Sequence, residues 1–119
     1  MLKTIFINEL PQKIPGWELR ESQIEMAELI STIMAERHYA LLEAGTGTGK
    51  TLAYLVPLFR HVTGRETKAI ICTATIALQD QLWHKDIPLV RQALEVNPKI
   101  ALAKGRSNYL CLYRLAEEL

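Results

Sequence analysis

The sequence predicts an α/β fold in which helices cover a parallel β-sheet. Three short apolar runs have the length of buried strands, namely 39–42, 68–73 and 99–103. The second run places β-branched residues on both of its faces, as expected of a strand that helices cover on each side. Segments with helical spacing separate the runs, and alternating strands and helices favour a parallel sheet.

The length and composition are those of one domain with a modest core, since the chain has 119 residues of which 49% are hydrophobic. We divide it into a lead-in, residues 1–19, and the amino-terminal part of a domain, residues 20–119. The lead-in contains Pro11, Pro15 and Gly16, so we expect turns and no long helix there. Its apolar side chains are expected to cover an edge of the core. These are Ile5, Ile7, Ile14 and Trp17.

The first helix is expected from about Arg20, where apolar residues begin to recur at helical spacing. Ser22 and Glu25 have the spacing of a capping box, which places the helix start near them. Gln23 then lies in the first turn. A glutamine amide both donates and accepts hydrogen bonds, as the N6 and N7 edge of adenine requires. The residues alone leave two interpretations of Gln23 open, an adenine contact and a solvated side chain.

The segment from Tyr39 to Thr51 is the one whose composition indicates a ligand. A short apolar run leads into alternating glycines and then into a helix from Lys50. Glycines allow positive φ angles and let backbone N–H groups converge on an anion. The unpaired N–H groups and the positive dipole end of the following helix add to the same site. The expected nucleotide-binding residues of this loop are Ala44, Gly45, Thr46, Gly47, Thr48, Gly49, Lys50 and Thr51.

The last two residues of this loop have the chemistry of catalytic groups. Lys50 would reach the outer phosphates of a nucleotide as a point charge, and the Thr51 hydroxyl would ligate a bridging Mg²⁺. The pattern is G-x-x-x-x-G-K-[ST] with one departure, because Ala44 replaces the first glycine. The alternative is a Gly/Thr-rich surface turn, which would also have to explain the strand before it and the helix after it. We therefore predict a phosphate loop.

The helix that follows, over 52–62, contains Pro57, which should kink it or end it early. Cys72 lies within the predicted strand 68–73 and is expected to be a core thiol. A further helix is expected from Ile76, ending at Trp83 to Lys85, and Pro88 would open a second amphipathic piece that runs through Leu94.

Thr75 immediately precedes the helix from Ile76 and is expected to cap it. Its hydroxyl and the free N–H groups of the helix would face the same way at the carboxyl edge of the sheet, where they could also hold a nucleic-acid phosphate. Capping alone and capping combined with phosphate binding both remain open from the residues.

Charge and cysteine content restrict the partners and the compartment. The formal net charge of +1 gives no bulk basic field, so a contact with nucleic acid must come from local placement of cations. The two cysteines fit a reducing, cytoplasmic location. Residues 1–10 are too short and too charged for a signal peptide or a membrane span, so we expect no membrane partner. The three histidines lack metal-ligand spacing.

The segment 104–111 combines two cations, a glycine, an aromatic ring and a thiol. It reads either as a loop entering the final helix, or as a basic loop with a stacking ring, or as a source of a cluster ligand. The residues alone do not choose among these three.

Four motifs follow one another along the chain. They are Arg20/Gln23/Met26, then the run from Ala44 to Thr51, then Thr73-Ala74-Thr75 with Leu78, Gln81 and Leu82, and finally Gly105-Arg106-Ser107-Asn108-Tyr109-Leu110-Cys111. Together they resemble the beginning of a DinG/XPD-type DNA helicase, the iron-sulfur branch of helicase superfamily II. The resemblance implies an incomplete P-loop NTPase (RecA-like) motor domain. Residues 20–119 would be the amino-terminal part of motor domain 1, ending at the start of the iron-sulfur cluster insertion.

The resemblance also implies roles for individual residues. Arg20 and Gln23 would bind the nucleotide, while Lys50 and Thr51 would hold the triphosphate of ATP and its Mg²⁺. Cys111 resembles the first of four cysteines that hold an iron-sulfur cluster, but one thiolate cannot hold a cluster and the other three ligands are absent, so no cluster is expected in this chain. Single-stranded DNA would contact Thr73, Thr75, Gln81, Arg106 and Tyr109.

The activity expected of the isolated chain is limited, because no Asp-Glu pair follows an apolar strand to position the magnesium ion and the attacking water. We expect the chain to bind nucleotide without efficient turnover, and the resemblance implies that the full-length protein unwinds DNA 5′ to 3′ with ATP hydrolysis. Unpaired sheet edges would favour self-association. The alternatives are a non-catalytic nucleotide- or DNA-binding module and, with less support, a small-molecule P-loop kinase.

Overall fold

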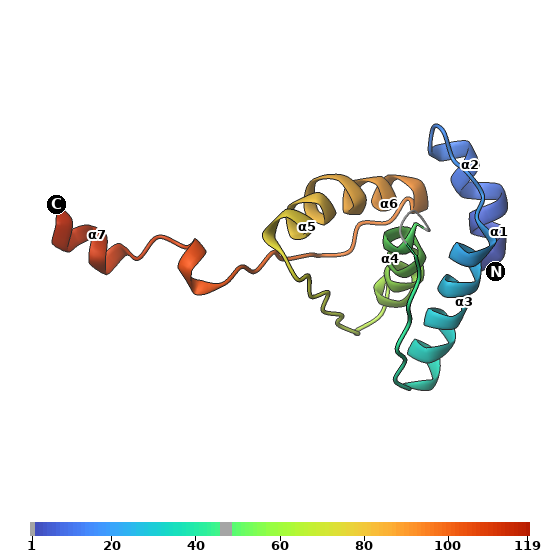
Figure 1. Ribbon diagram of the computed structural model, residues 1–119, viewed down its shortest axis with the longest axis horizontal. Coiled ribbons are helices and arrows are strands. Elements are labelled where there is room, and N and C mark those ends of the chain that lie inside the picture. The colour runs from blue at the N-terminus through green and yellow to red at the C-terminus, as the bar shows by residue number, and fades with distance from the viewer. Residues whose placement is uncertain (1, 46–48) are drawn as a thin grey trace.

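The computed structural model describes residues 2–45 and 49–119, which form a packed group of helices and a projecting tail (Figure 1). The radius of gyration is 17.1 Å, whereas a compact domain of this length has a radius of about 13.5 Å. The difference comes from the tail, in which 3-10 helix η3 (Arg106–Asn108) and helix α7 (Leu112–Glu118) extend away from the other helices. Every residue from 105 to 119 is exposed.

The lead-in is helical and contributes to the core. Helix α1 (Leu2–Thr4), π-helix η1 (Ile5–Glu9) and helix α2 (Leu10–Lys13) follow one another without a break. The expectation of turns in place of a helix is therefore wrong up to Lys13. Phe6 is fully buried and its ring centroid lies 6.0 Å from that of Trp17. Burial of these side chains supplies more free energy than the poor helix propensity of Pro11 removes.

A π-helical turn precedes both Pro11 and Pro88 and explains why the chain stays helical at these two prolines. π-Helix η2 (Leu82–Asp86) ends two residues before Pro88, as η1 ends two residues before Pro11. The Ile87 N–H donates to the Leu82 carbonyl five residues back, which widens the turn at the place where a proline ring would otherwise meet a carbonyl.

The predicted break between Trp83 and Pro88 is consequently wrong. Helix α5 (Ile76–Gln81), η2 and helix α6 (Ile87–Leu94) form one helical segment from Ile76 to Leu94. The hydrogen-bonding pattern changes at η2 but the helix does not stop. The residues just after Thr75 and the core residues of α6 therefore belong to one continuous helix.

Helix α4 (Lys50–Val62) lies at the centre, packed against α3 (Glu21–Glu36) on one side and α6 on the other (Figure 1). Pro57 is buried inside α4, which continues to Val62 and does not end early. Arg20 is the N-cap of α3 and its side chain makes no capping bond, so α3 begins one residue before Ser22 and the capping box expected there does not mark its start. The buried apolar core is Ile5, Phe6, Leu10, Ile24, Ala27, Ala53, Leu55, Val56, Phe59, Leu82, Ile87, Val90 and Ala93.

The predicted strands do not form β-ladders in the described part of the chain. Residues 39–42, 68–73 and 99–103 carry neither helix nor strand there, and Leu41 and Ile70 are 99% and 89% exposed. Two of these segments instead line an open, largely apolar groove of about 690 Å³ between α4 and α5. A strand needs a neighbour to bond its backbone groups, and these runs lack one, so the structure does not confirm the predicted parallel sheet.

No helix among the described residues is long and apolar enough to cross a membrane.

Candidate functional site

The predicted phosphate loop is described on both sides of its centre, and its lysine closes over it. The Lys50 ammonium donates to the Ala44 carbonyl at 2.6 Å and to the Gly45 carbonyl at 3.3 Å. Lys50 is the first residue of α4, so its backbone lies at the amide end of a thirteen-residue helix. The remaining loop residues, Thr46, Gly47 and Thr48, lie outside the described residues.

Gly49 ends the loop in the left-handed region, with φ 72° and ψ 35°, as the N-cap of α4. Its carbonyl accepts a hydrogen bond of 2.9 Å from the Gln23 side-chain amide. A Cβ at Gly49 would overlap the Gln23 amide nitrogen. The backbone angle therefore favours glycine here, and any other residue would also force the Gln23 amide to shift.

Gln23 is only 3% exposed, which rules out the interpretation of Gln23 as a solvated side chain. Its Nε2 is occupied by Gly49, while its Oε1 is buried without a hydrogen-bond partner among the described residues. A buried acceptor without a partner costs free energy, so such an atom is an expected contact for a ligand. Arg20 lies one turn earlier at the N-cap of α3, where its guanidinium pairs with Glu18 at 3.2 Å.

The Thr51 hydroxyl is hydrogen-bonded to Tyr54, which lies one helical turn later on α4. Burial raises the pKa of Tyr54, the bond with Thr51 partly offsets this, and the nearby charge of Asp86 raises the pKa further. A hydrogen bond that lowers the pKa of a phenol is one that the phenol oxygen accepts, so the Thr51 hydroxyl donates to Tyr54 and this bond uses none of the lone pairs of the Thr51 oxygen. Sequence reasoning missed Tyr54, although its i+3 spacing from Thr51 was a usable signal.

Two predicted DNA-binding residues of the third motif, Thr73 and Thr75, lie at the start of α5, and Gln81 is the last residue of this helix. The Thr75 hydroxyl accepts from the Leu78 N–H at 3.2 Å, which confirms that Thr75 caps α5. The Thr73 hydroxyl donates to the Thr75 carbonyl at 3.2 Å. Gln81 is exposed and points to Asp86, with 3.5 Å between its amide nitrogen and the carboxylate. Burial raises the pKa of Asp86, while Gln81 and Lys85 partly lower it.

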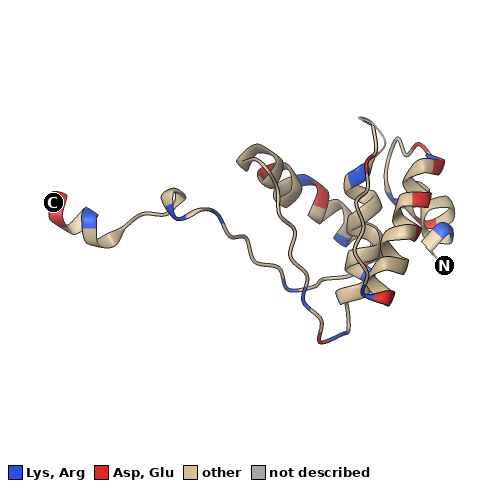
Figure 2. Cartoon of the chain, turned by 60° about the horizontal axis from the view of Figure 1, so that its bottom comes forward, with Lys and Arg blue, Asp and Glu red and all other residues tan. Residues whose placement is uncertain are grey.

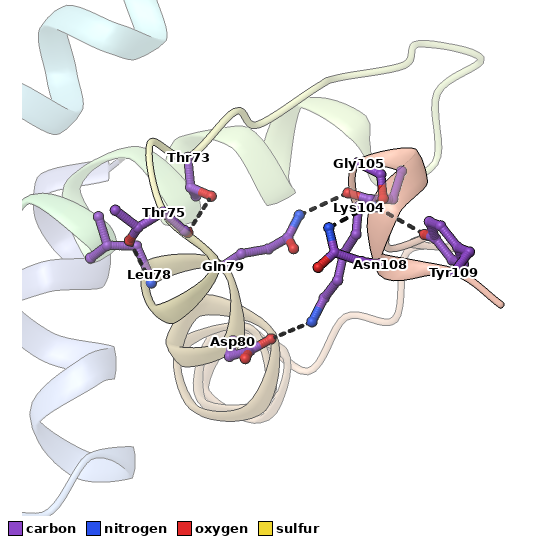
Figure 3. Close-up of polar contacts among 10 residues, drawn as sticks. Thr73, Thr75, Leu78, Gln79, Asp80, Lys104, Gly105, Asn108 and Tyr109 are labelled. Carbon is purple, nitrogen blue, oxygen red and sulfur yellow. Dashed lines mark hydrogen bonds and ion pairs between the residues drawn. The ribbon is translucent and has the colours of Figure 1, made fainter.

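Two contacts hold the beginning of the tail against α5, as Figure 3 shows. The Gln79 amide donates to the Ala103 carbonyl at 2.8 Å, and the Lys104 ammonium pairs with Asp80 at 3.0 Å. Segments 73–80 and 103–109, which carry separate sequence motifs, thereby lie side by side. No local sequence pattern predicts the contacts of Gln79 with Ala103 and of Asp80 with Lys104, and the sequence analysis did not single out Asp80.

Residues 104–109 of the tail form a small turn in which Arg106 is exposed. The Lys104 backbone N–H donates to the Tyr109 hydroxyl at 2.9 Å, and the Asn108 amide donates to the Gly105 carbonyl at 3.2 Å (Figure 3). Arg106 opens η3 within this turn. Figure 2 shows cations along the tail and acidic residues only at its end. Between Glu95 and Glu117 the sequence has no acidic residue, and its cations there are Lys99, Lys104, Arg106 and Arg114.

Both cysteines are free thiols and both are exposed. The expectation that Cys72 is a core thiol is wrong in this structure, because no strand among the described residues lies beside the segment that carries it. Cys111 precedes α7 without a side-chain capping bond. Among the residues that the structure describes, no group of three or more His, Cys, Asp or Glu side chains could hold a metal ion.

Comparison with known sequences places this arrangement in a family. Residues 23–108 match the DEAD/DEAH box helicase family, a range that begins at Gln23 and includes the phosphate loop and the start of α5. The chain belongs to the DEAD/DEAH box helicase family. No solved structure matches it significantly.

Individual helicase relatives are similar to nearly the whole chain. The ATP-dependent DNA helicase YoaA of Escherichia coli is 46% identical over 92% of this chain, and the ATP-dependent helicase DinG of Mycobacterium tuberculosis is 42% identical over 84%. The 3'-5' exonuclease DinG of Bacillus subtilis is 36% identical over 92%. The chain spans only 17%, 16% and 12% of these relatives. The predicted relationship to DinG-type helicases is confirmed.

Proposed function

We propose that this chain is the nucleotide-binding part of an ATP-dependent DNA helicase that, at full length, unwinds DNA 5′ to 3′. The observation that carries the proposal is the contact of the Lys50 ammonium with the Ala44 and Gly45 carbonyls. A lysine that already lies across the loop, beside a helix amide end, is placed to exchange these carbonyls for phosphate oxygens.

The nucleotide roles follow from the same geometry. Lys50 would neutralise the outer phosphates, and the loop amides would bind the others. Thr51 fits a magnesium ligand because Tyr54 fixes its hydroxyl while leaving an oxygen lone pair. Bound Mg²⁺ would supply charge neutralisation to the triphosphate. We propose binding without efficient turnover for the isolated chain.

The DNA roles rest on the cluster at α5. Thr73 and Thr75 lie at the beginning of α5, and the contact between Asp80 and Lys104 brings the basic tail beside them. Backbone amides and hydroxyls at a helix start bind phosphate, while Arg106 adds a cation and Tyr109 a ring on which a base can stack. Single-stranded DNA is therefore the proposed partner.

We also propose that the runs 39–42, 68–73 and 99–103 are strands of a parallel sheet once neighbouring strands are present. Their exposed apolar side chains and the apolar groove between two of them support this. Unpaired runs of this kind also favour self-association of the chain. The free thiols fit a cytoplasmic location.

Calorimetric titration with ATP and Mg²⁺ tests the nucleotide proposal. The chain should bind, and Lys50→Ala should weaken binding about tenfold to a hundredfold, because a charge-assisted hydrogen bond is lost. Lys68→Ala is the matched control, since Lys68 is exposed and outside the loop. Equal affinities of Lys50→Ala and the unaltered chain would refute the proposal.

A turnover assay separates the two candidate activities of the isolated chain. ATP hydrolysis stimulated by single-stranded DNA would contradict the binding-only proposal. ATP-dependent phosphorylation of a small metabolite would favour the kinase alternative instead.

A further inference from the structure

We propose that Asp80 is a positioning residue for DNA binding, because its carboxylate holds Lys104, and with it the basic tail, beside the threonines at the start of α5. This inference rests on the proposed function and deepens it, since it gives an acidic side chain a favourable effect on the binding of a polyanion. Three observations carry it: the pairing of Asp80 with Lys104, a second bond between the neighbouring residues, and the turn that begins at Lys104.

Two adjacent bonds join α5 to the beginning of the tail (Figure 3). The Lys104 ammonium pairs with the Asp80 carboxylate at 3.0 Å, and the Gln79 amide donates to the Ala103 carbonyl at 2.8 Å. Each bond joins residues that are 24 positions apart in the sequence. A single bond would leave the tail free to turn about it, whereas two bonds between consecutive residues fix its direction as well.

The direction of the tail is therefore set at this contact. Lys104 is partly buried, and every residue after it is exposed. The side chains of Lys104 and Asp80 are 26% and 44% exposed, so water screens their attraction in part. An ion pair of this exposure changes an equilibrium that depends on it by about twofold to fivefold.

The turn that begins at Lys104 contains the residues proposed to contact DNA. The Lys104 backbone N–H donates to the Tyr109 hydroxyl at 2.9 Å, and the Asn108 backbone N–H donates to the Gly105 carbonyl at 2.9 Å. Arg106 lies within the turn that these bonds close. The guanidinium and the ring thus belong to one small unit, and a displacement of Lys104 displaces both of them.

Electrostatics alone would give Asp80 the opposite effect on DNA binding. It is the one acidic residue in the sequence segments 73–80 and 103–109, which we assign to DNA. A carboxylate near bound phosphates repels them, so its neutralisation would raise the affinity if Asp80 had no other role. A positioning role predicts a lower affinity, because the cation and the ring would no longer be preorganised. The sign of the change separates the two.

Fluorescence anisotropy with a labelled oligothymidine measures this sign on the full chain. Asp80→Asn should bind about twofold to fivefold more weakly than the unaltered chain. Asp80→Glu keeps the carboxylate and should bind more tightly than Asp80→Asn. Glu117→Gln removes the same charge from the exposed end of the tail, and this matched control should bind at least as tightly as the unaltered chain. Equal or tighter binding by Asp80→Asn would overturn the inference.

A distance measurement tests the positioning without DNA. Cys72 and Cys111 are free, exposed thiols, so each can carry a nitroxide label in the unaltered sequence. Pulsed electron spin resonance should give one narrow distance distribution in the unaltered chain and in Glu117→Gln, and a broader one in Asp80→Asn. An identical distribution in Asp80→Asn would overturn the inference. A broad distribution in the unaltered chain would do so as well, whether or not any variant folds.

The outcomes distinguish this inference from the proposed function. If the unaltered chain binds single-stranded DNA and Asp80→Asn binds it equally well, the inference fails while the proposed DNA partner stands. If the unaltered chain does not bind single-stranded DNA, the proposed partner fails and the inference with it.

Discussion

Replacing Thr75 by aspartate separates its role as a helix cap from a role in binding DNA. The Thr75 hydroxyl accepts from the Leu78 N–H at 3.2 Å. Aspartate is at least as good an N-cap as threonine and its charge complements the helix dipole. Thr75→Asp should therefore leave the free energy of unfolding within about 0.5 kcal/mol of the original, whereas Thr75→Ala should lower it by about 1 kcal/mol.

The same substitution should have the opposite effect on DNA binding. A carboxylate placed where a phosphate binds is repelled by roughly 1 to 4 kcal/mol at a distance near 4 Å, so the affinity for single-stranded DNA should fall at least about fivefold. Fluorescence anisotropy with a labelled oligothymidine measures this, and the salt dependence of binding should fall as one phosphate contact is lost.

Thr67→Asp adds the same charge in an exposed turn away from α5 and serves as the control. If Thr75→Asp and Thr67→Asp bind DNA with equal affinity, Thr75 is only a cap. If Thr75→Ala unfolds at the same denaturant concentration as the original chain, the capping argument is itself refuted.

Three further predictions concern stability. Phe6→Ala should lower the free energy of unfolding by about 3 to 5 kcal/mol, and Ile7→Ala, at a 40% exposed neighbour, by less than about 1 kcal/mol; urea titrations giving equal losses would contradict the assignment of the lead-in to the core. Arg37→Gly should raise the free energy of unfolding by roughly 0.5 to 1 kcal/mol, and with it the melting temperature, because Arg37 has φ 58° and glycine adopts this angle without strain. Arg60→Gly within α4 should lower the melting temperature. Asp86→Asn should stabilise the chain at pH 7. Burial raises the pKa of Asp86, so the folded state loses stability as the pH rises from the ordinary pKa of 3.8 through the raised one, and asparagine carries no charge to bury. A gain in stability that is equally large below pH 3.8 would contradict this explanation.

Sequence patterns located the local features of the chain better than the fold around them. The glycine pattern before Lys50 depends on local backbone chemistry, so the loop and the helix after it could be located from a short window. The cap at Thr75 is local in the same way. Gln23 was singled out by its place in the first helical turn and by its resemblance to an adenine-reading motif, but its burial against Gly49 depends on how α3 packs on α4, which no local pattern encodes.

The errors have a common physical cause. Local turn and strand signals were overridden by tertiary structure: Pro11 and Pro88 are accommodated by π-helical turns, and burial of Phe6 outweighs the turn residues around it. The run containing Ile70 has a strand composition, yet β-structure requires a partner strand that the described chain does not provide. Strand propensity alone therefore could not produce the predicted sheet.

The most direct test of the central claim is a crystal structure of this chain with a non-hydrolysable ATP analogue and Mg²⁺. We predict that the triphosphate lies against the first amides of α4, that the Lys50 ammonium has left the Ala44 carbonyl for a phosphate oxygen, and that Thr51 faces the metal ion. A nucleotide bound elsewhere, with the 2.6 Å contact between Lys50 and Ala44 intact, would contradict the assignment of this loop as a phosphate site.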